Sequence, residues 1–149
     1  MDELTLPTGW LPVPPAEVGL DAELLAIKAD THGSGFTATI VVDGAGLAPG
    51  ETLADLADRS AAALPTGIVV GRDAAGPRLT QSLRLTHLAD DVPRRVVRVE
   101  EYLALPDRSR PGWTGVLRAV STATVEQADA VAADFTRLLA GLDGLAANA

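Results

Sequence analysis

Residues 78–107 read RLTQSLRLTHLADDVPRRVVRVEEYLALPD, and this stretch decides the fold. Two arms of alternating apolar and polar residues flank a turn at residues 90–93, DDVP. Such alternation is typical of antiparallel strands with one buried face, so we predict a long β-hairpin. The stretch shows no reaction chemistry, and function must be inferred from the few polar residues that break the pattern.

The register of this hairpin predicts which side chains share a face of the sheet. With the turn centred near Asp91, Leu83 lies opposite Val99 and Gln81 lies opposite Glu101. That face is apolar except for Gln81 and Glu101, and we predict that it is the buried one. The other face is predicted to be a solvated surface with ion pairs, formed by Thr80, Ser82, Arg84 and Thr86 on one strand and by Val96, Arg98, Glu100 and Tyr102 on the other.

Gln81 and Glu101 are the two residues that interrupt the apolar face. A buried carboxylate without a partner is unfavourable, so this pair must hydrogen-bond, meet an arginine or line a cavity. One interpretation is an internal amide–carboxylate contact, or a face that is partly open near its end. The other is a cleft between the sheet and the helices that recognises a ligand or a peptide. Glu100 and Glu101 are consecutive in a strand and point to opposite faces, which excludes joint catalysis by these two carboxylates.

The segments around the hairpin predict a sheet with two helices. Thr52 can cap an amphipathic helix that ends at Pro65, and residues 124–127, TVEQ, form a capping box for a second helix. Residues 1–19 are predicted to be a proline-rich N-terminal arm, because prolines exclude helix interiors and central strands. We predict one α+β domain, residues 1–149, with a largely antiparallel sheet of about six strands flanked by two main helices and with strands in residues 22–29, 36–42, 68–70, 78–107 and 113–122.

The composition excludes several classes of function. The chain has 149 residues, no cysteine, two histidines and a net charge of −8. The lack of cysteine excludes disulfides and thiolate zinc sites, and two histidines argue against a histidine metal cage. The negative charge argues against nucleic-acid binding, and no apolar run approaches the roughly 20 residues of a membrane span. We therefore predict no metal, no cofactor, no nucleic acid and no membrane span.

The charges are unevenly distributed along the chain. Residues 1–58 hold ten acidic residues and one basic residue, whereas residues 59–118 hold ten arginines and six acidic residues. The arginine-rich segment is either a solvated, salt-bridged sheet face or a docking surface for an acidic partner. The candidate binding residues are Gln81, Arg84, Arg98, Glu100, Glu101, Tyr102 and Trp113. Trp113 follows an irregular loop, where a tryptophan anchors either the edge of the core or a binding partner.

Residues 43–50, DGAGLAPG, come nearest to a nucleotide-binding motif. The third glycine of a dinucleotide fingerprint would fall at Pro49, and Asp43 and Glu51 place negative charge on either side. The spacing and the charge both oppose phosphate binding. We predict an ordinary flexible connection.

A family resemblance rests on five segments: residues 6–10 (LPTGW), 36–42 (FTATIVV), 52–57 (TLADLA), 81–85 (QSLRL) and 101–106 (EYLALP). Together they resemble the LpqN-type family of actinobacteria. More remotely they are similar to the PsbP-like superfamily, which includes secretion-effector chaperones of the Eag type. The resemblance implies a PsbP-like antiparallel sheet between helices, in proteins that bind other molecules and do not transform them. Lipoprotein members carry a signal sequence and a lipid-bearing cysteine. This chain has neither, so the resemblance implies a cytoplasmic adaptor or chaperone.

Three hypotheses for function follow. The first is a non-enzymatic cytoplasmic binding protein, an accessory factor or chaperone for a secreted partner such as a secretion effector. It is motivated by a complete fold without a nucleophile–base arrangement. The second is a small-molecule binder or hydrolase with its pocket at Gln81 and Glu101, helped by His87. The third is a homo-oligomer that pairs exposed sheet edges or faces.

Overall fold

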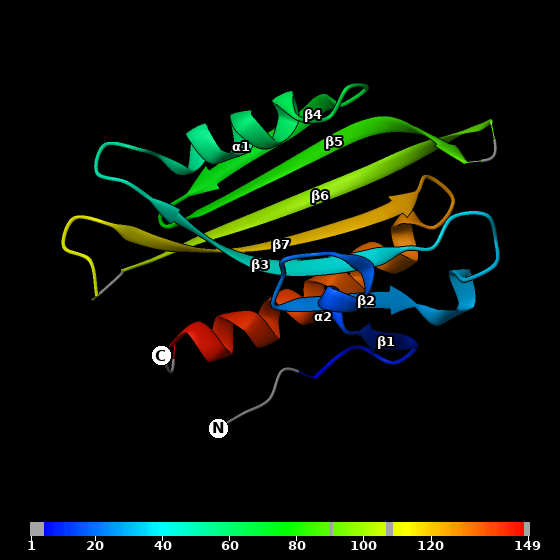
Figure 1. Cartoon of the computed structure of the whole chain (residues 1–149), viewed down its shortest axis with the longest axis horizontal. Helices are drawn as coiled ribbons and strands as arrows, with labels where there is room; N and C mark the ends of the chain where they lie inside the picture. Colours follow the sequence, from blue (N-terminus) through cyan, green and yellow to red (C-terminus); the bar gives the residue numbers. More distant parts are fainter. Residues whose placement is uncertain (1–4, 90, 107–108, 148–149) are drawn as a thin grey trace.

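The computed structural model shows a twisted antiparallel sheet with helices packed on it (Figure 1). It describes residues 5–89, 91–106 and 109–147. Within these residues the sheet has seven strands in the order β1-β2-β3-β7-β6-β5-β4, and neighbouring strands are antiparallel. The predicted α+β class, with a largely antiparallel sheet and two α-helices, is confirmed for this part of the chain.

The strands are β1 (Trp10–Val13), β2 (Leu24–Lys28), β3 (Thr39–Leu47), β4 (Ile68–Ala75), β5 (Arg78–Ala89), β6 (Val92–Pro106) and β7 (Thr114–Thr124). The helices are α1 (Leu53–Ala62) and α2 (Ala128–Ala147), with two short 3₁₀ helices, η1 (Pro15–Val18) and η2 (Ala29–Thr31). The long predicted hairpin is β5 and β6.

The prediction of about six strands is wrong by one strand, which lies in the proline-rich arm. This strand, β1, pairs with β2 and places Trp10 opposite Lys28 at one edge of the sheet. Pro12 has no N–H to donate to a neighbouring strand, and an edge strand needs donors on one side only. Prolines therefore exclude a central strand but allow this one.

The β5–β6 hairpin has a register one residue away from the predicted one. Ala89 pairs with Val92, and Asp91 has a φ of 62°, in the left-handed region that tight turns use. The centre of the turn therefore lies before Asp91. As a result Gln81 faces Glu100 in place of its predicted partner. A shift of one residue moves one strand's whole set of side chains to the other face relative to its neighbour.

Both hairpin strands alternate as predicted, but their apolar sides face opposite helices. Leu79 on β5 packs in the core under α1, whereas Val99 on β6 packs against the core under α2. The apolar side of β5 thus packs toward α1, and that of β6 packs toward α2. The predicted solvated face is wrong as a result, because Glu100 and Tyr102 are buried on the α1 side.

Helix α1 begins with a capping box. Thr52 Oγ1 accepts a hydrogen bond from the Asp55 N–H at 3.2 Å, and Asp55 Oδ2 accepts one from the Thr52 N–H at 2.8 Å. These two bonds satisfy backbone donors that a helix start leaves without partners. The buried apolar residues of this side are Leu47, Ala57, Leu79, Tyr102 and Val116.

Helix α2 covers the other face over the β1-β2-β3-β7 half of the sheet. The predicted capping residues Thr124 and Gln127 do exchange two hydrogen bonds, of 3.0 and 3.3 Å, just before the helix starts. Val125 precedes the helix and is 41% exposed. The stripe that packs on the sheet consists of Val131, Phe135, Leu138 and Leu142, and it meets Trp10, Ala26, Ile40, Val42 and Ala119.

The predicted flexible connection at residues 43–50 is wrong for its first half. Strand β3 continues to Leu47, and Asp43 pairs with Arg118 on β7. Pairing with a long neighbouring strand provides backbone partners to glycine-containing sequence that has weak strand propensity alone. This extension places Asp43 in the sheet, where it pairs with Arg118 beside the buried polar residues described below.

Gly35, in the connection between β2 and β3, supports a stability prediction. Its φ is 96°, and a Cβ at this position would overlap the guanidinium of Arg94. Gly35→Ala is expected to lower the free energy of unfolding by about 1–2 kcal/mol, measured by urea denaturation. Gly33→Ala is the matched control, because Gly33 has a φ of 86° but open space around its Cβ. Equal losses in the two variants would contradict a role for the contact with Arg94.

Candidate functional site

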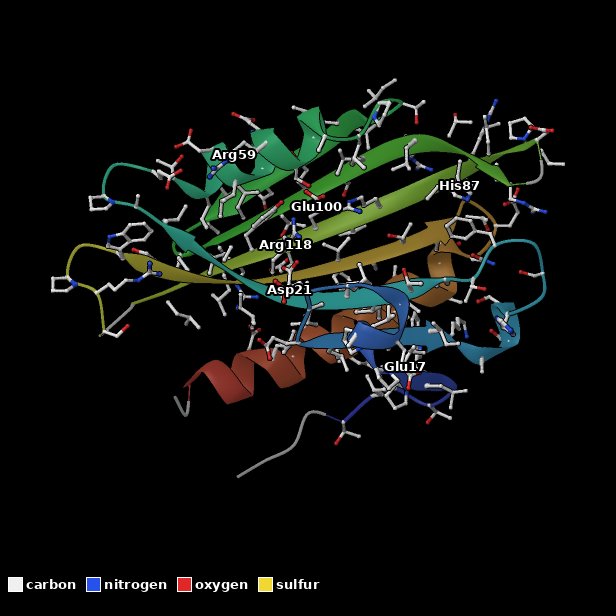
Figure 2. The ribbon with its side chains drawn as sticks, viewed as in Figure 1. Glu17, Asp21, Arg59, His87, Glu100 and Arg118 are labelled. Carbon is white, nitrogen blue, oxygen red and sulfur yellow. The ribbon has the colours of Figure 1, made fainter. Side chains whose placement is uncertain are left out.

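A buried polar cluster lies between α1 and the sheet, centred on Glu100 of β6 (Figure 2). The side chain of Glu100 is completely buried, as is that of its cross-strand neighbour Gln81 on β5. Four of the predicted candidate binding residues therefore come together here. We call this group the Glu100 cluster, and it consists of Ser60, Gln81, Arg98, Glu100 and Tyr102.

Each of the two carboxylate oxygens of Glu100 accepts two hydrogen bonds. Oε1 accepts from Gln81 Nε2 and from the Tyr102 hydroxyl, each at 2.9 Å. Oε2 accepts from Ser60 Oγ at 2.5 Å and from Arg98 Nε at 2.7 Å. Four donors, one of them charged, meet the requirement that a buried carboxylate be hydrogen-bonded and paired.

The cluster extends across the sheet toward β4. Gln81 Oε1 accepts from Arg72 Nε at 3.0 Å, and Gln81 Nε2 also donates to the carbonyl of Ala57 at 3.1 Å. Arg72 Nη2 in turn lies 2.9 Å from Asp58 Oδ1 on α1. Both the oxygen and the nitrogen of the Gln81 amide are thus hydrogen-bonded, and the amide connects α1 to strands β4, β5 and β6.

On the other side of Glu100, polar side chains continue across the sheet to β7 and β3. Arg118 lies opposite Tyr102, and its Nε and Nη2 donate to the two carboxylate oxygens of Asp43 at 2.9 and 2.5 Å. Such a two-point contact fixes the guanidinium plane as well as its position. In Figure 2 the labelled Glu100 and Arg118 follow one another across the sheet below α1.

These contacts shift the protonation equilibria of three groups. Burial by itself raises the pKa of Glu100, but hydrogen bonds from Ser60 and Arg98 and the charge of Arg98 outweigh it, so the pKa lies below its usual value. Burial and the negative charge of Glu100 raise the pKa of Tyr102. The hydrogen bond to Asp43 raises the pKa of Arg118 further.

The Glu100 carboxylate is therefore held ionised with its oxygens occupied. A general base needs a free lone pair within reach of a substrate proton, and a nucleophile needs access. Neither is available at a side chain with four donors and no exposed surface. This arrangement fastens α1 to the sheet.

Glu101 lies on the opposite face, so the predicted contact with Gln81 does not form. Glu101 Oε2 accepts from the Thr80 hydroxyl at 2.6 Å, and Oε1 accepts from Arg78 Nη1 at 3.2 Å. Arg78 also binds Asp143 of α2 at 2.5 Å. The cavity beside these residues measures about 10 Å³, which is about the minimum for one water. Glu101 thus ties α2 to the sheet, and the cavity that it lines has no room for a larger ligand.

His87 lies near the hairpin tip, away from Glu100 (Figure 2). Its ring packs edge-on against Phe36 at 5.3 Å between centroids. Gln81 and His87 share one face of β5, whereas Glu101 is on the other face of the sheet. The site required by the small-molecule or hydrolase hypothesis is not assembled.

Trp113 is half-buried just before β7. The guanidinium carbon of Arg110 lies 4.2 Å from the centre of the Trp113 ring, a cation–π contact. The predicted role of Trp113 as an anchor of the core edge or of a partner stays a prediction.

An open pocket of about 400 Å³ lies on the part of the α2-side face that α2 leaves uncovered. Arg84 on β5 and Arg95 on β6 project from this face as diagonal neighbours, because Arg84 pairs with Val97 and Thr86 pairs with Arg95. We call it the Arg84–Arg95 pocket. Its lining is Thr66, Ile68, Arg84, Leu85, Thr86, Arg95, Val96 and Val125.

The two arginines of the pocket differ from Arg98 of the Glu100 cluster, which is paired with a carboxylate. Both are exposed, and neither guanidinium group makes a hydrogen bond or an ion pair with a described residue. Sequence reasoning selected Arg84 but missed Arg95, Ile68 and Val125. The alternation of both strands contained the signal, since in the observed register it brings Arg84, Thr86 and Arg95 to one face.

Within residues 5–89, 91–106 and 109–147, no group of three histidine or carboxylate residues could hold a metal ion. None of the helices formed by these residues is long and apolar enough to cross a membrane.

The fold is similar to that of LpqN from Mycobacterium tuberculosis, a protein described as involved in cell envelope biogenesis. The two structures superpose with a TM-score of 0.62 and 14% sequence identity, over 90% of this chain and 77% of LpqN. At this identity the likeness shows an LpqN-like fold and no more. No protein-family model and no curated protein matches the sequence.

Proposed function

We propose that this chain is a non-enzymatic binding protein, an accessory factor or chaperone for a secreted protein partner. One contrast carries the proposal. The carboxylate with the most polar neighbours, Glu100, is buried and fully hydrogen-bonded, whereas Arg84 and Arg95 stand exposed in an open pocket without partners. Buried satisfied groups hold a fold together, while exposed unpaired groups around a concave surface are available for binding.

The LpqN-like fold supports a role in processes of the cell envelope. The finer parts of the proposal are a cytoplasmic location, a secretion effector as partner and a relationship to the PsbP-like and Eag-type proteins. They rest on the resemblance of the sequence segments. An acidic chain with a locally basic pocket is consistent with selective capture of an acidic partner, because long-range repulsion disfavours other acidic proteins.

A site-specific photo-crosslinker tests this function. The photoreactive residue p-benzoylphenylalanine is placed at Thr86 in the Arg84–Arg95 pocket, at Thr136 on the exposed side of α2 and at Val18 on the arm, and the cells are irradiated. We expect one dominant protein adduct from Thr86. Mass spectrometry should identify a partner with a secretion signal, and fractionation before export should place the adduct in the cytoplasm.

Three positions serve as controls for one another, because all three are exposed but lie on different surfaces. An adduct from Thr136 or Val18 in place of Thr86 would keep the binding function and move its surface. The absence of a protein adduct from all three positions, with the chain folded and expressed, would contradict the proposed function.

A further inference from the structure

The two edges of the sheet are protected very differently. At one edge, β1 contains Pro12 and is followed by Pro14 and Pro15, which hinder pairing with another strand. At the other edge, all eight residues of β4 are exposed, and the strand opens with Ile68-Val69-Val70. Their exposed fractions are 66%, 40% and 56%, so nothing in the described chain covers this end of β4.

An exposed edge of β-branched residues is a template for pairing with another strand, and natural proteins usually shield such an edge with charges or prolines. Strand β4 has a bulge between Val69 and Gly71, but its first residues carry no charge. These uncharged residues lie next to the Arg84–Arg95 pocket, since Ile68 pairs with Arg84 and lines the pocket.

The pocket adds a chemical preference to the open edge. Arg84 and Arg95 are two unpaired guanidinium groups on one face, with Ile68 and Val125 as exposed apolar neighbours, 66% and 41% accessible. Like charges this close repel each other and favour an anionic group between them. Guanidinium groups prefer carboxylates, which accept two parallel hydrogen bonds.

We propose that an extended acidic segment of a protein partner adds to β4 as an eighth strand. Its backbone pairs with the free edge of β4, and its alternate side chains lie on the pocket side of the sheet. Acidic side chains there extend over Ile68 toward Arg84 on β5, and Arg95 lies one strand further, on β6. This inference rests on the proposed binding function and names its surface and the chemistry of its partner.

The alternation of side chains in a strand explains how one partner segment contacts both the β4 edge and the pocket. In a strand every second side chain points to the same face, so a segment with acids at alternate positions directs all of them toward the pocket. Backbone pairing supplies affinity without sequence preference, and the side chains on alternate positions supply specificity. The negative charge of the rest of the chain would orient an acidic segment toward the Arg84–Arg95 pocket.

The test uses defined peptides and fluorescence anisotropy. The probe is a fluorescein-labelled EVEVEVEV peptide, and its controls are QVQVQVQV and the same acidic peptide with alternate amides N-methylated on the edge-facing side. The acidic peptide is expected to bind at least about tenfold more tightly than either control, because the glutamine peptide lacks the carboxylate charge and the N-methylated peptide lacks the backbone donors that face the edge. Raising the salt from 0.15 M to 1 M should weaken this binding.

Protein variants locate the site. Arg84→Gln combined with Arg95→Gln is expected to weaken binding of the acidic peptide by about tenfold or more, whereas Arg137→Gln on α2 should leave it unchanged. Arg137 is the matched control because its side chain is 74% exposed. Thermal unfolding checks that the double variant remains folded, and the peptide controls test the proposal even if it does not.

Several outcomes would overturn the inference. Equal binding of the glutamine peptide would remove the acidic preference, and equal binding of the N-methylated peptide would remove strand addition. A concentration-dependent dimer in light scattering that the acidic peptide dissociates would assign the edge to a second copy of the chain. If these tests fail while Thr136 or Val18 still crosslinks a secreted protein, the binding function stands and only its surface is wrong.

Discussion

Glu100→Ala is expected to lower the free energy of unfolding by about 3–5 kcal/mol, the range found when one partner of a buried ion pair is removed. The substitution leaves a cavity and removes the acceptor of four donors. Arg98, whose side chain is 22% exposed, would lose its carboxylate, and the Gln81 amide and the Tyr102 hydroxyl would each lose a buried partner. Urea denaturation followed by far-UV circular dichroism measures the effect.

Two further variants make this prediction specific. Glu100→Gln keeps the shape but removes the charge, so its loss should be smaller than that of Glu100→Ala. Glu17→Ala should change the free energy of unfolding by no more than about 0.5 kcal/mol, because Glu17 is exposed on the arm (Figure 2). A loss in Glu100→Ala as small as that in Glu17→Ala would show that the Glu100 cluster does not hold α1 to the sheet.

The pH dependence of the same variants follows from the lowered pKa of Glu100. A carboxyl with a lower pKa in the folded state than in the unfolded state stabilises the fold when it is ionised. This contribution is complete above the unfolded value of 4.5 and is lost as the pH falls through the folded value. The stability difference between wild type and Glu100→Gln should therefore be constant at neutral pH and shrink below about pH 4.5.

Trp10→Ala is expected to cost about 3–5 kcal/mol, as large aromatic truncations in cores do. Trp10 is only 5% exposed and packs in the core under α2. Its indole Nε1 donates to Asp134 Oδ2 at 2.8 Å, which ties edge strand β1 to the helix. The truncation removes a large apolar side chain and leaves the Asp134 carboxylate without this donor.

A double-mutant cycle separates the hydrogen bond from the packing. Trp10→Phe should retain most of the packing, and Asp134→Ala should remove the acceptor together with the ion pair to Arg137, so each should cost less than Trp10→Ala. The double variant closes the cycle and isolates the hydrogen bond. If β1 detaches locally, hydrogen exchange would show rapid loss of protection in β1 and β2 with little change in the global unfolding midpoint. That result would contradict an anchoring role of Trp10 in global stability.

Local signals in the sequence predicted the helices well. The Thr52 cap and the capping residues Thr124 and Gln127 depend on residues within one turn of each other. The face of Glu100 could not be predicted in the same way. It depends on where the turn is centred. A displacement of the centre by half a residue at Asp91 shifts the pairing of β5 with β6 by one residue, so every side chain of β6 changes face relative to β5.

The candidate site was affected by the same ambiguity. Gln81 was identified as an interruption of an apolar face, and it is buried in a polar cluster, but its partner is Glu100 and not Glu101. Arg84 was identified as a surface residue on the segment rich in arginine. Its neighbour Arg95 was missed, because the pocket forms from a cross-strand diagonal that exists only in the observed register.

The sequence by itself determined that this chain forms an antiparallel sheet with two capped helices, because alternation, caps and turns are set by neighbouring residues. Tertiary structure alone decided which polar residues are buried and which remain free. Both sheet faces carry a helix, so both faces of β5 and β6 needed apolar residues, and the sequence could not show which face each helix would cover. That choice buried Glu100 under α1 and left Arg84 and Arg95 exposed beside an open edge.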